Sequence, residues 1–136
     1  MTNIDKVIEL WPVIINLKKW IANLKRAKDA RKKESIDALR QLILTVRTTN
    51  VYIKTIPSNK RNYEKENELS MEWTKLGFEL KDLGIEKASK KCEEYGKYWS
   101  RVMLLDELTI NKIQDGMTVL ELEANLIINE TNHLKL

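Results

Sequence analysis

Residues 69–99 read LSMEWTKLGFELKDLGIEKASKKCEEYGKYW, and this stretch decides the fold. On each side of Gly84 the apolar residues recur at intervals of three and four, which places them along one side of an α-helix. The two apolar seams are Leu69, Trp73, Leu76, Leu80, Leu83 and Ile85, Ala88, Cys92, Tyr95, Trp99. Because glycine readily adopts the left-handed conformation that ends a helix, the stretch predicts a helical hairpin that turns at Gly84.

Two further seams with the same spacing lie before and after this hairpin. They are Ile36, Leu39, Ile43, Val46, Ile53 and Ile110, Ile113, Met117, Leu120, Ala124, Ile127. The first should end before Pro57, because a proline pushes the preceding residue out of the α region. The second should begin after Asp106, a favourable N-cap, and its phase predicts one helix through Asp115 and Gly116, where a break is the alternative. We therefore predict an all-α protein in which residues 35–136 form an antiparallel up-and-down four-helix bundle.

The composition fits one globular domain of 136 residues, with 43% hydrophobic and 32% charged residues. Cys92 has no partner for a disulfide within the chain, which fits a reducing compartment, and its place in a seam predicts a buried packing residue. Glu9 interrupts the N-terminal apolar stretch, so we expect no signal peptide. The uncharged run 10–17 is much shorter than the roughly 20 residues that span a bilayer. We expect a cytoplasmic protein, with peripheral membrane attachment as the alternative.

Residues 1–34 form a separate segment in this prediction, made of an amphipathic helix and a basic connector. Apolar residues cover about two-thirds of the helix circumference between Ile4 and Leu24, which is far wider than the stripe of an ordinary surface helix. The connector 25–33 reads KRAKDARKK, with six basic residues and one acid. Either this segment continues into the first bundle helix as one rod, or Ser35 starts a new helix as its N-cap.

Sequence motifs for catalysis are missing, and we expect no enzyme, no cofactor and no metal. A zinc site needs more ligands than one cysteine and one histidine. Di-iron helical bundles use two Glu-x-x-His motifs, and this chain has one, at Glu130 and His133. That motif lies close to the C-terminal end, where a solvated position is expected.

The bundle core itself should contain no acid, base or metal ligand, because the seams are apolar apart from one position. That position is Asn50, between Val46 and Ile53, and a single buried Asn often fixes helix register. The acidic set Glu64, Glu66, Glu68 and Glu72 is interpreted as a solvated face, for which Arg40 or Arg47 could supply ion-pair partners.

Three functional hypotheses concern the N-terminal segment. We expect a non-enzymatic interaction or assembly module that contacts a protein partner, or a second copy, through the N-terminal helix. The alternative is attachment of this helix to an anionic membrane surface. A nonspecific nucleic-acid tether is the least favoured hypothesis, because no aromatic residue lies among the basic ones. The predicted contact residues are Trp11, Ile14, Leu17, Trp20, Ile21 and Leu24 with the basic residues Lys18, Lys19, Lys25, Arg26, Lys28, Arg31, Lys32 and Lys33.

Overall fold

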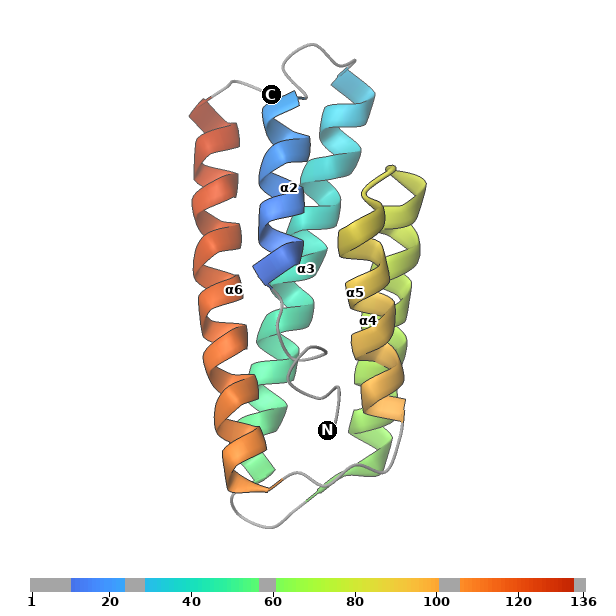
Figure 1. Cartoon of the computed structure of the whole chain (residues 1–136), viewed down its shortest axis with the longest axis vertical. Helices are drawn as coiled ribbons and strands as arrows, with labels where there is room; N and C mark the ends of the chain where they lie inside the picture. Colours follow the sequence, from blue (N-terminus) through green and yellow to red (C-terminus); the bar gives the residue numbers. More distant parts are fainter. Residues whose placement is uncertain (1–10, 24–28, 57–60, 101–105, 134–136) are drawn as a thin grey trace.

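Five α-helices make up nearly all of the computed structural model, which describes residues 11–23, 29–56, 61–100 and 106–133 (Figure 1). They are α2 (Trp11–Asn23), α3 (Asp29–Thr55), α4 (Tyr63–Asp82), α5 (Glu86–Ser100) and α6 (Glu107–His133). No strand occurs among these residues. The all-α prediction is confirmed, and the helices pack together as a bundle.

The predicted hairpin at Gly84 is confirmed. Gly84 has a φ of 81°, and its N–H donates to the carbonyl of Lys81 at 2.9 Å. The N–H of Ile85 donates to the carbonyl of Leu80, also at 2.9 Å. These two bonds form a Schellman motif, which satisfies carbonyls at the end of α4 and lets α5 begin one residue after Ile85.

Two other predicted helix ends are also as expected. The α-helix α3 stops at Thr55, two residues before the proline. Asp106 caps α6, because its Oδ1 accepts the N–H of Thr109 at 2.8 Å. The helix then continues without a break through Asp115 and Gly116 to His133. The prediction of one helix in this region is therefore confirmed.

All four predicted seams point into one shared core. Ile36 and the polar seam position Asn50 are half-buried, and the other seam residues are buried. Cys92 is fully buried as predicted, and burial raises the pKa of its thiol. The apolar spacing therefore identified the core side of α3, α4, α5 and α6 correctly.

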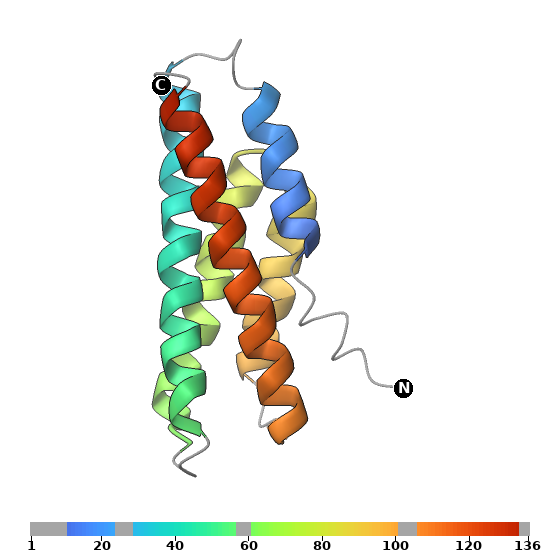
Figure 2. The same cartoon turned by 90° about the vertical axis from the view of Figure 1, so that its left-hand side faces the viewer.

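The N-terminal helix α2 joins this core. It contacts α3, α5 and α6, and its Val13 and Leu17 are buried in the same apolar cluster as the four seams. Figure 2 shows α2 and α3 on opposite sides of the view, and the Nε1 of Trp20 on α2 donates to the Oγ of Ser35 on α3 at 2.6 Å. Fifteen residues of a continuous helix would place these two residues about 22 Å apart. The single-rod alternative is therefore wrong.

Ser35 lies inside α3 and is not its N-cap, because that helix already begins at Asp29. Its hydroxyl donates to the carbonyl of Arg31 at 3.0 Å and accepts the indole N–H of Trp20. The guanidinium of Arg31 lies 5.5 Å from the Trp20 ring centroid and donates to the carbonyl of Leu83 at 3.1 Å. This group of contacts joins α2 and α3 to the α4–α5 turn.

Candidate binding surfaces

A buried carboxylate, Glu66, lies in the core near the start of α4. It is only 3% exposed, and Arg61 binds it with two hydrogen bonds, Nε to Oε2 at 2.9 Å and Nη2 to Oε1 at 2.6 Å. The hydroxyl of Tyr52 also donates to Glu66, and it accepts the N–H of Asn62 at 2.9 Å. The prediction of a core without an acid or base is therefore wrong, and so is the interpretation of Glu66 as part of a solvated face.

Sequence reasoning missed this group although a signal was present. Glu66 lies three residues before Leu69 and seven before Trp73, so it continues the α4 seam by one turn. Arg61, five residues earlier, supplies the charge that makes burial of a carboxylate tolerable. The group links the end of α3, through Tyr52, to the start of α4.

Burial, and next the hydrogen bond to Glu66, raise the pKa of the Tyr52 hydroxyl to about 12. Tyr98 lies near the same charged pair, and burial raises its pKa to about 12 as well. Both hydroxyls therefore stay protonated near neutral pH. Tyr52 acts there as a fixed hydrogen-bond donor to the carboxylate.

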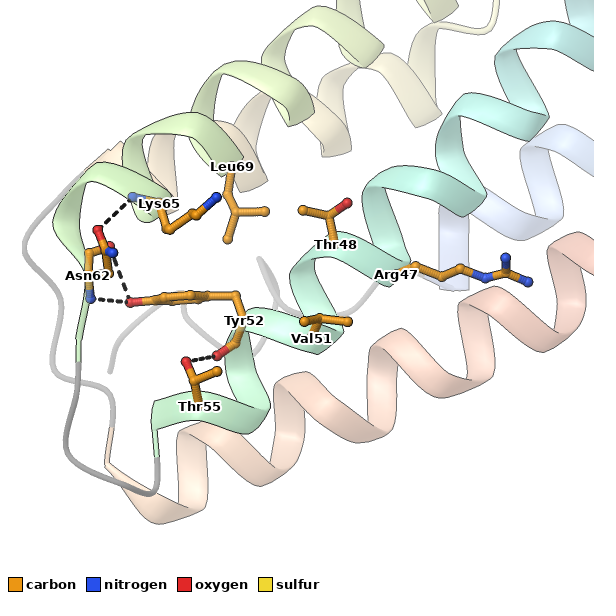
Figure 3. A pocket seen from close by; sticks show the side chains of 8 residues that line it. All are labelled: Arg47, Thr48, Val51, Tyr52, Thr55, Asn62, Lys65 and Leu69. Carbon is orange, nitrogen blue, oxygen red and sulfur yellow. Dashed lines mark hydrogen bonds between the residues drawn. The ribbon is translucent and has the colours of Figure 1, made fainter.

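A pocket of about 560 Å³ opens beside Tyr52, between the C-terminal part of α3 and the first turns of α4 (Figure 3). This volume is within the range of small-molecule sites in proteins. Its lining is mixed: apolar groups, hydroxyls, an amide and two basic side chains. The lining residues are Arg47, Thr48, Val51, Tyr52, Thr55, Asn62, Lys65 and Leu69.

Both basic side chains at the pocket already have acidic neighbours. Arg47 Nε lies 3.2 Å from Glu121 Oε2 on α6, and Lys65 Nζ lies 3.5 Å from Glu68 Oε2 on its own helix. More than half of each basic side chain is exposed, so these ion pairs contribute about 0–1 kcal/mol each. Arg40 lies near Asp37, at 3.8 Å. Neither arginine makes the predicted pair with the acidic set of α4.

A second surface is shared by α2 and α6, and we call it the α2–α6 face. It consists of four partly exposed apolar side chains: Ile15, Val119, Leu122 and Leu126. The three on α6 follow the intervals of three and four, on the side opposite the buried seam. The ion pair Lys18–Glu123, at 3.0 Å, joins the two helices beside these side chains. This outer stripe was not recognised in the sequence.

The predicted contact residues of the N-terminal segment are divided by the structure. Leu17 is buried, Trp20 is half-buried against Ser35, and Lys18 and Lys19 are exposed. Arg31 is turned toward Trp20 and the Leu83 carbonyl, Lys32 is half-buried, and Lys33 is exposed. Outside the described residues lie Leu24, Lys25, Arg26 and Lys28, together with the side chains of Trp11, Ile14 and Ile21. No binding role is assigned to these residues by the structure.

Asn50 and Glu72 are among the described residues with a buried polar atom that has no hydrogen-bond partner. The Oδ1 atom of Asn50 is buried, although the residue as a whole is half-buried. That Asn50 fixes helix register stays a prediction. The Oε2 of Glu72 is buried as well, and desolvation, followed by the neighbouring Glu68, raises the pKa of Glu72. No group of three or more His, Cys, Asp or Glu side chains in the described ranges is arranged to hold a metal ion.

The helices as described include none that is both long and apolar enough to cross a bilayer. No known protein family, curated protein or solved structure matches this chain. Functional inference therefore rests on the surfaces of the molecule itself.

Proposed function

We propose that this protein is a non-enzymatic helical assembly module, which contacts a second copy of itself through the α2–α6 face. The frame is proposed to be an up-and-down four-helix bundle, α3 to α6, to which α2 adds a further helix. The N-terminal helix keeps the contact role expected from the sequence, but the side proposed for the contact is the one that carries Ile15 and not the one that carries Leu17. Val13 and Leu17 are already buried in the chain's own core, whereas Ile15 is available.

The apolar stripe on α6 is the observation that supports this proposal. Val119, Leu122 and Leu126 are 47%, 60% and 46% exposed, at the spacing that helix–helix contacts use. Isolated exposed apolar residues are common on soluble proteins. Three of them lie on one outward side of α6, and Ile15 is exposed on α2, which the ion pair Lys18–Glu123 joins to α6. A partner helix that covered these side chains would remove apolar surface from water.

A second copy is the occupant we favour because the face carries both signs of charge. Lys18 and Glu123 lie on the two helices of this face, so a two-fold axis that passes between them places Lys18 of each copy near Glu123 of the other. Closed two-fold dimers are also the commonest protein assemblies.

Light scattering coupled to gel filtration, over a range of protein concentrations, tests the proposal. We expect the wild-type chain to form a dimer and Leu122→Lys to be monomeric with an unchanged circular dichroism spectrum, because a charge then lies in the contact. Phe78→Lys is the matched control: Phe78 is an exposed apolar residue on α4, away from this face, and its replacement should leave the dimer intact.

A wild-type chain that stays monomeric at every concentration would contradict self-assembly. So would equal dissociation of the Leu122 and Phe78 variants, which would indicate nonspecific association. Deletion of α2 is a poor test, because it removes Val13 and Leu17 from the core and uncovers the rest of it.

Attachment to an anionic membrane is the second candidate, supported by the exposed Lys19 near Ile15 on α2. Flotation with anionic and with neutral liposomes distinguishes it. Binding that needs the anionic lipid and is lost in Lys19→Glu would favour this candidate over self-assembly.

A further inference from the structure

Tyr52 forms the floor of the α3–α4 pocket, and it is held in place. Its hydroxyl donates to Glu66 and accepts the Asn62 N–H, so the ring cannot swing away without breaking both bonds. Figure 3 shows the ring lying flat below Lys65 and Leu69. The pocket is therefore formed before any ligand arrives, which lowers the entropy cost of binding.

The walls of the pocket are largely apolar. Val51 and Leu69 contribute aliphatic groups from α3 and α4. Thr48 donates its hydroxyl proton to the carbonyl of Leu44 at 2.9 Å, and Figure 3 shows its methyl group on the side toward Leu69. Thr55 similarly donates to the carbonyl of Tyr52 at 2.6 Å. An apolar ligand segment would thus meet methyl groups and an aromatic ring.

The charged lining residues of this pocket are both cationic. Lys65 extends over the pocket in Figure 3, whereas Arg47 points away toward α6. Asn62 contributes an amide NH₂ group from the same end of α4 as Lys65. The present partner of Lys65 is Glu68, at 3.5 Å in an exposed ion pair, so another carboxylate can replace it at little cost.

We propose that this pocket binds a small amphiphile with one carboxylate and an unbranched hydrocarbon chain, in other words a medium-chain fatty acid. The chain lies against Tyr52, Val51 and Leu69, and the carboxylate accepts hydrogen bonds from Lys65 and Asn62. A single negative charge suits the site, because Arg47 is directed toward Glu121 and leaves Lys65 as the cation over the pocket. The inference is independent of the proposed dimer.

Titration calorimetry of the full chain tests this assignment, with decanoate and decyltrimethylammonium below their micelle concentrations and decanol below its solubility limit. The three probes share one hydrocarbon chain and differ in head group. We expect one decanoate per chain, bound about tenfold or more tightly than either other probe. Equal affinity for the three head groups, or no decanoate binding, would overturn the proposal.

Two variants locate the binding. Val51→Trp should block the pocket and abolish decanoate binding, and Lys65→Glu should weaken it about tenfold or more because it reverses the charge at the head group. Both replaced residues are exposed, so neither change adds a group to the core.

Matched controls lie on the same two helices. Leu44, the site of the control Leu44→Trp, lies one heptad before Val51 on the exposed side of α3. Lys75, the site of the control Lys75→Glu, is exposed on α4, and neither residue lines the pocket. Both controls should bind decanoate like the wild-type chain. If Val51→Trp binds normally, or if the controls lose binding equally, the ligand lies elsewhere and the proposal is wrong.

Discussion

Helix α4 packs against α5 and against α3 in different ways. Toward α5 the backbones approach closely: Ser89 Oγ donates to the carbonyl of Gly77 at 2.6 Å, and Trp73 stacks on Tyr95 with centroids 4.7 Å apart. Toward α3 the buried Glu66, paired with Arg61, accepts the hydroxyl proton of Tyr52, and a pocket of about 560 Å³ lies between the helices. Small residues such as Gly77 and Ser89 allow the close approach of α4 and α5, which we call the close side of α4. On the side toward α3, which we call the open side, the Arg61–Glu66 salt bridge and the Tyr52 hydroxyl connect the helices.

The largest expected effect concerns the open side. Replacing Arg61 with Met leaves the Glu66 carboxylate buried without its cation, and we expect a loss of about 3–5 kcal/mol in the free energy of unfolding. The double variant Arg61→Met/Glu66→Leu should recover most of this loss, because no unpaired charge remains. Urea denaturation followed by circular dichroism measures both values.

Arg40→Met serves as the control for this experiment. Arg40 is largely exposed and lies 3.8 Å from Asp37, so its replacement should cost less than about 1 kcal/mol. If Arg61→Met were no more harmful than Arg40→Met, the α3–α4 contact would not depend on the charged group, and the contrast between the two sides of α4 would fail.

An intermediate effect is expected on the close side. A Cβ at position 96 would lie 2.8 Å from the carbonyl oxygen of Ser70 and 3.1 Å from the N of Thr74, both backbone atoms of α4. Overpacking of this kind costs about 1–3 kcal/mol, and the better helix propensity of alanine offsets part of it. Gly96→Ala should therefore lower the free energy of unfolding by about 1–2 kcal/mol.

Thermal unfolding of Gly96→Ala and of Lys97→Ala measures this difference. Lys97 is the next residue on α5 and is exposed, so its replacement alters the helix without touching α4. If Gly96→Ala were as stable as the Lys97→Ala control, α4 and α5 could move apart to admit a methyl group at no cost. The close approach would then contribute nothing to the free energy of unfolding.

The smallest effect involves Glu72, which lies on the same side of α4 as Lys65 and Leu69. Its raised pKa means that the fold favours the protonated form, so its contribution to stability decreases as pH rises through that pKa. Glu72→Gln should stabilise the protein at neutral pH by a few tenths of a kcal/mol, after allowance for solvent screening.

Melting temperatures between acidic and neutral pH check the sign of this effect. The gain should vanish well below the ordinary glutamate pKa of about 4.3, where Glu72 is protonated in the folded and unfolded chains alike. Glu79→Gln, one heptad further along α4, is the control for loss of charge alone. A gain that persists in acid would contradict the role assigned to desolvation.

Much of the fold could be predicted because the spacing of apolar residues indicates which side of a helix is buried. The four seams, the turn at Gly84 and the cap at Asp106 all follow from local patterns, and the structure confirms them. The position of α2 could not be predicted in the same way. Its apolar width showed that it must be covered, but which helices cover it is a property of the assembled tertiary structure.

The candidate sites were harder to predict for a related reason. Glu66 was excluded from the core because it is charged, and its burial depends on Arg61, which lies outside the helical repeat. The stripe with Leu122 at its centre was hidden by the stronger buried seam on the same helix. The pocket lies between α3 and α4, and the distance between two helices depends on tertiary packing and not on a local residue pattern.

Asn16 connects two helices that are far apart in the sequence, α2 and α5. Its Oδ1, on α2, accepts the N–H of Ala88 in the first turn of α5 at 3.2 Å. When α2 lifts from the bundle, this amide loses its acceptor, and the first turn of α5 becomes easier to unwind. The hydrogen on the Ala88 nitrogen then becomes available for exchange with solvent, so that one backbone amide reports how often the N-terminal helix opens.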